Sequence, residues 1–483
     1  MRWAEALHPV RMQRVALLTH RDTLRAMLVG IADEGTVDLN GDQADGGDRP
    51  GRAPVEQSRD EAPTSAAARL ARLRTGTLRP ALSAQPPDLD QLERAGRVDL
   101  IAGEAEWQRQ AAHVVSHGDI DALLGWIPLS ALPQLAARIA PSGSAAVALP
   151  RPAGVDPPTQ LSPRPAAREF APLVQTYGTV SYADLDPSLL AGLSYLLMFG
   201  MMFADVGHGA LLAAGGLACR FLPWRRLRPL RRVWVFITGA GLTSMAAGVL
   251  YGEFFGPTGV IAPLAVAPLE QPVALLLAAV AVGAFLLAGA YVIGTVNRVR
   301  EGGWRRAAYD PSGLAGTTVF AGLGLAVGAF YLHLLWVTIA GAALIAVGLA
   351  AAGIGLFAAA GGGASGATQA AVELFDMTIR LGSNLVSFAR LAAFGLTHAA
   401  LGGVIWSATS AMWGHGAVRT AGAVVVFTVG NALAFALEAL IAGVQALRLE
   451  YYELFSRVFD VEGRPYRPWH VPLARTEEPC RPG

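Results

Sequence analysis

The residues with the clearest chemical potential lie in the last third of the chain, inside long apolar runs. Arg390 lies in the stretch LVSFARLAAFGLTHAA (385–400), and His398 follows it eight positions later. A cation at the centre of a bilayer costs about 2.5–3.5 kcal/mol, so it requires either a short route to the headgroups or a function. Arg390 lies ten positions after Arg380, which marks the near end of the run. This depth favours a functional cation over one that only reaches the interface.

A polar stripe surrounds this arginine. Ser383, Ser387 and Arg390 occupy positions i, i+4 and i+7, which places them on one face of a helix. Asp376 and Arg380 continue the same face, although the sequence leaves the role of Arg380 open. Such a stripe can line a water-filled cavity or face a partner helix. For the serines alone, interhelical hydrogen bonding is the simpler explanation.

The last apolar run repeats the pattern. Glu438, Gln445, Arg448 and Tyr452 are separated by seven, three and four positions, again on one helical face. Glu438 lies deep in the run, and Arg448 follows about 15 Å further along the helix axis. A buried ion pair between two helices and a path for protons or ions both explain these charges.

Composition indicates that these runs are membrane spans. The chain has 483 residues, of which 53% are hydrophobic and 16% charged, and its mean hydropathy is +0.40. These values are typical of a polytopic membrane protein with a soluble part. The net charge of +1 gives no indication of nucleic acid as a partner. Cys219 and Cys480 lack metal-ligand spacing, so no metal or other cofactor is expected.

We predict about eight membrane-spanning helices, since a span needs about 20 residues. The predicted spans are 188–205, 207–222, 231–252, 273–297, 313–333, 335–358, 371–412 and 419–456, the last two being long and tilted. The basic loops 220–232 and 297–306 then lie on one side of the membrane, whereas 256–272 has no basic residue. The positive-inside rule therefore places both termini in the cytoplasm.

The N-terminal region predicts a small cytoplasmic α/β domain. A strand is expected at 14–20, a helix at 21–35 and a returning strand at 36–39. Residues 40–66 are polar and rich in Gly and Pro, which favours a disordered linker. The predicted organisation is therefore an N-terminal domain over 1–180, a transmembrane domain over 181–470 and a cytoplasmic tail over 471–483.

Four motifs together resemble the membrane stator subunit of V/A-type rotary ATPases, the subunit a or subunit I family. They are FGMMFADVGHG at 199–209, YGEFFG at 251–256, SNLVSFARLAAFGLTHA at 383–399 and LEALIAGVQALRLEYYELFSRVF at 437–459. The resemblance covers residues 160–470, and the N-terminal region is similar only in pattern. Family members usually carry two small α/β lobes separated by long helices, of which only one lobe and fragments of another are identifiable.

The resemblance implies a role for each matching residue. Arg390 corresponds to the essential arginine that faces a rotating ring of proteolipid subunits, and Arg448 corresponds to a supporting arginine. The outer half-channel would be lined by Glu438, His398 and Asp205, the cytoplasmic half-channel by Asp376 and Ser383, and the remaining ion path by Ser387 and Gln445. Capping of a tight hairpin explains Asp205 and His208 equally well, and Glu253 is expected to be structural.

The implied function is the stator of a rotary ATPase in a prokaryotic plasma membrane. It would carry protons or sodium ions through two offset half-channels against the ring, coupled to ATP hydrolysis or synthesis. The implied partners are the proteolipid ring, the central and peripheral stalks, the catalytic ATPase subunits and the bilayer. The chain contains no lysine and hence no Walker-type phosphate loop, so ATP would be handled by partner subunits.

Two other functions fit the same charges. A stand-alone ion-coupled secondary transporter could use Arg390 and Glu438 as its site, but it predicts internal repeats, which the sequence lacks. A scaffold that anchors the stalk after losing ion conduction would not need Arg390, Arg448, Glu438 and His398.

Overall fold

The computed structural model divides the chain into two compact units. It describes residues 9–39, 65–73, 79–152, 155–161, 165–221, 231, 233–414, 416–458 and 463–474. The N-terminal unit comprises Pro9–Gln160 and Gly463–Gly483, and the membrane unit comprises Met1–His8 and Leu161–Glu462. Apart from its last two residues, the predicted linker 40–66 lies outside the described residues.

A four-stranded antiparallel sheet forms the framework of the N-terminal unit. Its strands are β1 (Met12–His20), β2 (Val115–His117), β3 (Ile120–Pro128) and β4 (Ala145–Leu149), in the order β2-β3-β1-β4. The central strand β1 carries the fully buried side chains of Val15 and Leu17, and Leu17 lies opposite Leu123 of β3. The predicted strand at 14–20 is therefore confirmed.

Five short helices accompany this sheet. They are α1 (Leu24–Glu34), α2 (Ala66–Leu73), α3 (Leu89–Arg94), α4 (Val98–Ala111) and α5 (Leu132–Ile139), with single 3-10 turns at Arg21–Thr23 and Ala140–Ser142. The helix predicted at 21–35 is confirmed as the first of these turns followed by α1. The strand predicted at 36–39 is wrong, because only Asp38 makes an isolated bridge, to Trp126.

The C-terminal segment 463–474 completes the core of the N-terminal unit. Trp469 and Val471 are buried in the same hydrophobic cluster as β1 and α1. The Trp469 backbone N–H donates to the carbonyl of Val37 at 2.8 Å, and the Val471 N–H donates to Ala32 at 3.2 Å. The compact units thus divide at residues 161 and 463, whereas the domain boundaries predicted from sequence fell at 180 and 470.

Helices form the membrane unit. In chain order they are α6 (Pro165–Tyr177), α7 (Ser188–Met202), α8 (Val206–Phe221), α9 (Trp234–Tyr251), α10 (Pro272–Tyr309), α11 (Leu314–Tyr331), α12 (Leu335–Ala359), α13 (Gly363–Ser387), α14 (Ala389–Met412), α15 (Ala417–Leu449) and α16 (Ser456–Val458). A π-helical stretch, Glu450–Phe455, joins the last two. Within the described residues, six helical segments are long and apolar enough to span a membrane. The predicted class, a polytopic helical membrane protein with a small N-terminal sheet domain, is confirmed.

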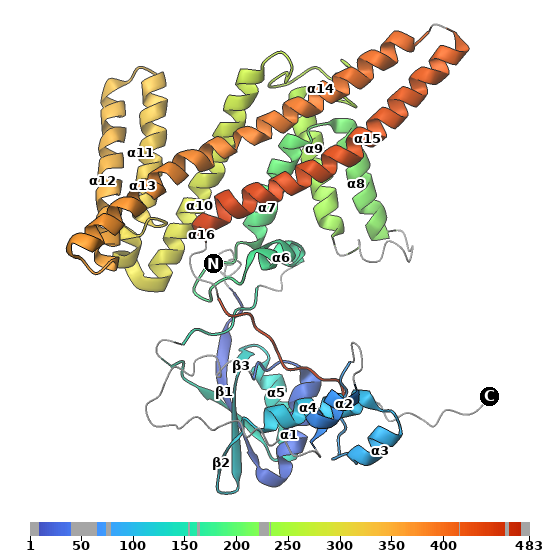
Figure 1. The fold of residues 1–483 in the computed structure, drawn as a ribbon, viewed down its shortest axis with the longest axis vertical. Coiled ribbons are helices and arrows are strands. Elements are labelled where there is room, and N and C mark those ends of the chain that lie inside the picture. The colour runs from blue at the N-terminus through green and yellow to red at the C-terminus, as the bar shows by residue number, and fades with distance from the viewer. Residues whose placement is uncertain are drawn as a thin grey trace. The chain divides into compact units, whose positions relative to one another are not determined.

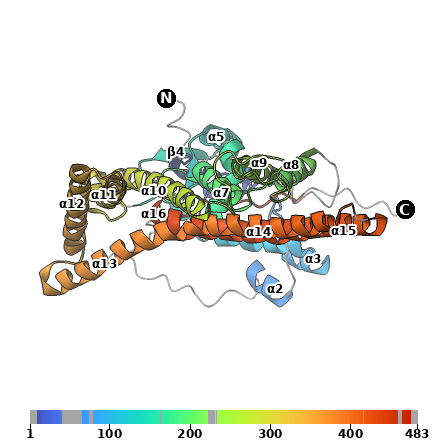
Figure 2. The ribbon, with the colours of Figure 1, turned by 90° about the horizontal axis from the view of Figure 1, so that it is seen from above.

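Helices α14 and α15 form an inclined pair. Figure 1 shows α14 and α15 side by side and inclined to α10, α11 and α12. Seen from above in Figure 2, α7, α8, α9 and α10 lie on one side of this pair. No other described helix of the membrane unit covers its opposite side.

The first two predicted spans form two short helices. Helices α7 and α8 have 15 and 16 residues, or about 22–24 Å each, against a hydrocarbon core of about 30 Å. Asp205 lies in the tight connection between them and is fully buried. An irregular connection of this kind is tolerated at membrane depth only where protein surrounds it.

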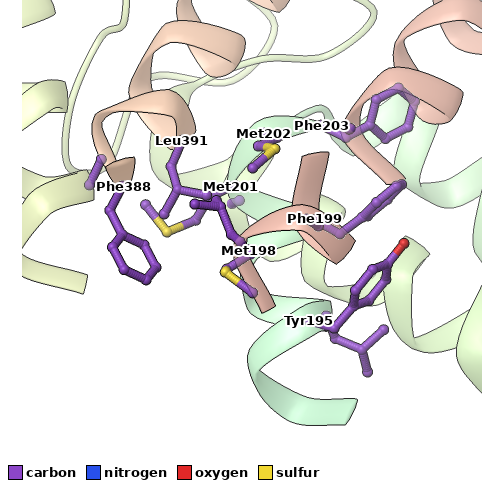
Figure 3. Packing of buried hydrophobic residues seen from close by; sticks show 14 of the residues in the cluster. Tyr195, Met198, Phe199, Met201, Met202, Phe203, Phe388 and Leu391 are labelled. Carbon is purple, nitrogen blue, oxygen red and sulfur yellow. The ribbon is translucent and has the colours of Figure 1, made fainter. Parts of the chain in front are cut away.

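The predicted span at 371–412 is broken at Phe388, between α13 and α14. The Phe388 ring is fully buried against α10, where a side chain on Gly283 would collide with it. Figure 3 shows Phe388 and Leu391 with Met198 and Met201 of α7 in the core of the membrane unit. These anchors determine the direction in which α14 leaves the break.

We predict that Trp469→Ala destabilises the N-terminal unit by about 3 kcal/mol or more, since removing a buried aromatic leaves a cavity. The measurement is limited proteolysis of the full chain over a urea series, which reports unfolding of this unit. Trp336→Ala is the control, because that side chain is 82% exposed. Equal urea midpoints for the two variants would show that the C-terminal segment does not stabilise the unit.

Candidate functional site

Helix α14 presents two different faces. One face is buried and includes Leu391, Gly395 and His398. On another face Thr397 and Val404 are exposed, and Arg390 begins this face as a half-buried residue. Arg390 and His398 therefore belong to the same helix but point in different directions, about 80° apart at 3.6 residues per turn.

The guanidinium of Arg390 is incompletely paired. Its Nη1 atom is buried and has no hydrogen-bond partner among the described residues. Glu453, which is itself buried, interacts electrostatically with both Arg390 and Arg448. The two arginines predicted from sequence are thus brought to a common neighbourhood by a third charge.

The spacing of an α-helix does not predict that Glu453 shares a face with Arg448. Five residues turn about 140° in an α-helix, which separates Glu453 from Arg448. The π-helical stretch Glu450–Phe455 has a wider turn, with hydrogen bonds between positions i and i+5. A carboxylate five positions after the arginine was the available signal.

Helix α15 presents an exposed apolar stripe that ends in an arginine. Arg448 is exposed, and it follows Leu437, Ile441 and Val444 at helical spacing, all exposed as well. Gln445 is half-buried, and its Oε1 atom has no partner in the described part of the chain. An exposed apolar stripe at membrane depth faces lipid or another membrane protein.

The predicted polar residues of α13 are not part of a buried site. Asp376 and Arg380 form an exposed i,i+4 ion pair with a distance of 2.7 Å between Oδ2 and Nε. Ser383 is exposed, and the Ser387 hydroxyl donates to the Ser383 carbonyl at 3.0 Å. These residues line the accessible side of α13 near the break at Phe388.

The residues predicted to line the outer half-channel meet in one buried cluster. His398 Nδ1 contacts Glu438 Oε2 of α15, and His398 Nε2 lies 3.7 Å from Asp205 Oδ2. His208 Nδ1 lies 3.8 Å from the other oxygen of Asp205. Asp205, His208 and His398 are all at least 96% buried. The structure therefore joins three helices and one connection around these polar groups.

Backbone groups orient Asp205. Its Oδ1 accepts a hydrogen bond from the backbone N–H of His208 at 2.8 Å, which caps α8. Its Oδ2 accepts from the backbone N–H of Gly256, also at 2.8 Å. Gly256 has φ +92° and lies so close to Gly402 of α14 that a side chain on either would collide. The capping role considered for Asp205 is therefore confirmed, and it coexists with the contact to His398.

Aromatic rings and one further carboxylate surround this cluster. The Phe203 ring lies 5.7 Å from His208 and 5.5 Å from His398, and Phe435 lies 5.7 Å from His208. Glu253 is buried and interacts electrostatically with Asp205 and His398. The sequence did not indicate that Glu253 shares the site, because 48 positions separate it from Asp205.

The two polar regions are displaced along the α14–α15 pair. Arg390 and His398 are eight residues apart, or about 12 Å along α14, and Glu438 and Arg448 are ten residues apart, or about 15 Å along α15. A buried histidine–carboxylate cluster thus lies on one side of the arginines, and the exposed polar residues of α13 lie on the other.

Comparison with known proteins identifies relatives of this arrangement. The V-type ATPase 116kDa subunit family matches residues 122–258. A-type ATP synthase subunit I of Pyrococcus horikoshii is 25% identical over 77% of this chain and 57% of its own length. The corresponding subunit of Halobacterium salinarum is 28% identical over 65% of this chain and 51% of its own length.

A bacterial relative shows a shorter, stronger similarity. V-type ATP synthase subunit I 2 of Treponema pallidum is 40% identical over 20% of this chain and 21% of its own length. The chain spans about half the length of the longest-matching curated relatives. With its polytopic helical fold, the chain is thus similar to subunit I of V/A-type ATPases over most of its length, and the family model itself matches residues 122–258.

Proposed function

We propose that this chain is the membrane stator of a V/A-type rotary ATPase and carries protons or sodium ions through two offset half-channels. The observation that best supports the proposal is the half-buried Arg390, whose Nη1 has no hydrogen-bond partner in the described structure. It lies on the partly exposed face of α14 that also carries Thr397 and Val404.

Arg390 would act on a carboxylate of a passing ring subunit. At about 4 Å and an effective dielectric constant near 20, the attraction is roughly 4 kcal/mol. This lowers the pKa of the ring carboxylate by about three. The carboxylate therefore releases its ion when it faces Arg390 and binds one again before it returns to lipid. The guanidinium itself cannot deprotonate, so it blocks direct passage between the half-channels.

The two displaced polar regions would supply the half-channels. Asp205, His398 and Glu438 would form the outer path. The side chains of Asp205 and His398 are buried, and the Glu438 side chain is 16% exposed. The cytoplasmic path would be formed by three residues of α13, namely Asp376, Ser383 and Ser387. Gln445 and Arg448 lie between these regions on α15.

The proposed partners are the proteolipid ring, the central and peripheral stalk subunits and the catalytic ATPase subunits, with lipid covering the remaining apolar faces. We place the complex in a prokaryotic plasma membrane with the N-terminal unit in the cytoplasm. The basic segments between α8 and α9 and at the end of α10 support this orientation, and the archaeal and bacterial relatives support the location.

Arg390→Gln is expected to abolish coupled transport. Losing roughly 4 kcal/mol of attraction to the ring carboxylate corresponds to about a thousandfold lower rate of ion release. The measurement is ATP-driven acidification of vesicles that contain the purified complex. Arg419→Gln is the matched control, because Arg419 is an exposed arginine at the far end of α15. Acidification that persists in an intact Arg390→Gln complex would rule out this role.

Glu438→Gln is expected to slow transport about tenfold without stopping it, because the carboxylate assists transfer through His398 and does not meet the ring. The same acidification assay measures the rate at matched subunit composition. Glu270→Gln removes an exposed carboxylate and should leave the rate unchanged. Failure of the Glu438→Gln complex to assemble would favour a structural ion pair between α14 and α15.

A further inference from the structure

The buried cluster contains more ligand atoms than its protein contacts use. One ligand atom from each of Asp205, His208 and His398 lies within 4.8 Å of the others. Both ring nitrogens of His208 and the Nε2 atom of His398 lack a hydrogen-bond partner among the described residues. His208 Nδ1 lies 3.8 Å from Asp205 Oδ1, and His398 Nε2 lies 3.7 Å from Asp205 Oδ2, both beyond hydrogen-bond distance.

The groups around these atoms hold them in the way that hydrogen-bond partners hold the ligands of a metal ion. A histidine that binds a metal through one nitrogen usually bonds a carboxylate through the other. His398 has this arrangement, with Nδ1 on Glu438 and Nε2 directed towards Asp205. Backbone N–H groups of His208 and Gly256 hold the Asp205 carboxylate in place.

We propose that Asp205, His208 and His398 bind one Zn²⁺ ion, with a fourth position open to water. Two imidazoles and a carboxylate favour zinc over magnesium or calcium, which prefer all-oxygen ligands. Zinc–ligand distances of about 2.0–2.2 Å require ligand atoms roughly 3.3–3.6 Å apart. The three ligand atoms lie within 4.8 Å of one another, so zinc binding requires them to move together by about 1 Å. The nearby carboxylates of Glu253 and Glu438 offset the charge of the ion.

The site would also regulate transport. This consequence rests on the proposed function, in which Asp205 and His398 line the outer half-channel. A bound Zn²⁺ ion occupies the nitrogen and oxygen atoms that would otherwise transfer ions, so micromolar zinc is expected to inhibit ATP-driven acidification by the assembled complex.

Zinc binding to the purified full chain tests the site directly. Titration calorimetry with Zn²⁺ is expected to give one ion per chain, and Co²⁺ is expected to give the visible absorption bands of a four-coordinate site. Glu438→Gln should weaken Zn²⁺ binding about 10–100-fold, because it removes the carboxylate that orients His398. His208→Gln should weaken binding further, because it removes a ligand. His333→Gln is the control, because His333 is exposed in the turn between α11 and α12.

Each outcome decides a separate question. Stoichiometric binding that is weakened in His208→Gln and Glu438→Gln but retained in His333→Gln supports the site. If His208→Gln does not fold, Glu438→Gln alone carries the comparison. Absence of binding to the wild-type chain, or equal affinity in all variants, overturns the zinc site and leaves the proposed function intact. Binding to the cluster without inhibition of acidification instead overturns the placement of these residues on the ion path.

Discussion

The membrane unit depends on the burial of one carboxylate, Asp205, at the connection of two short helices. A charge at this depth is costly unless hydrogen bonds and opposite charges surround it. The N–H groups of His208 and Gly256 supply the hydrogen bonds, and His208 and His398 supply the imidazoles. Asp205 therefore ties α7, α8, the segment after α9 and α14 together.

The same constraint gives α14 its two faces. The contact of Gly402 with Gly256 brings α14 so close to the segment after α9 that His398 must lie inside the unit. Arg390, two residues after the break at Phe388, then points to a different side. A half-buried cation and a fully buried polar cluster are thus combined on one helix.

The N-terminal unit in turn depends on residues that follow the membrane helices in the sequence. The segment 463–474 packs into the hydrophobic core around β1 and α1, although the whole membrane unit lies between them in the sequence.

The sequence by itself determined the polytopic helical class and the strand and helix at 14–20 and 21–35, because apolar periodicity and span length are local properties. The roles of Arg390, Arg448, Glu438, His398 and Asp205, which it indicated through motifs of a known family, stay predictions. It did not predict the break at Phe388, which depends on the space at Gly283 of a helix about a hundred positions earlier.

Only the tertiary structure decided which polar groups meet. The proximity of Glu253 to Asp205, the approach of Glu453 to both arginines and the return of Trp469 to the first strand all join residues that share no local pattern. Helical spacing predicts which side chains share a face. Which segment contacts that face depends on helix packing, and the π-helical turn changes which residues share it. Local sequence patterns therefore do not predict contacts between distant segments.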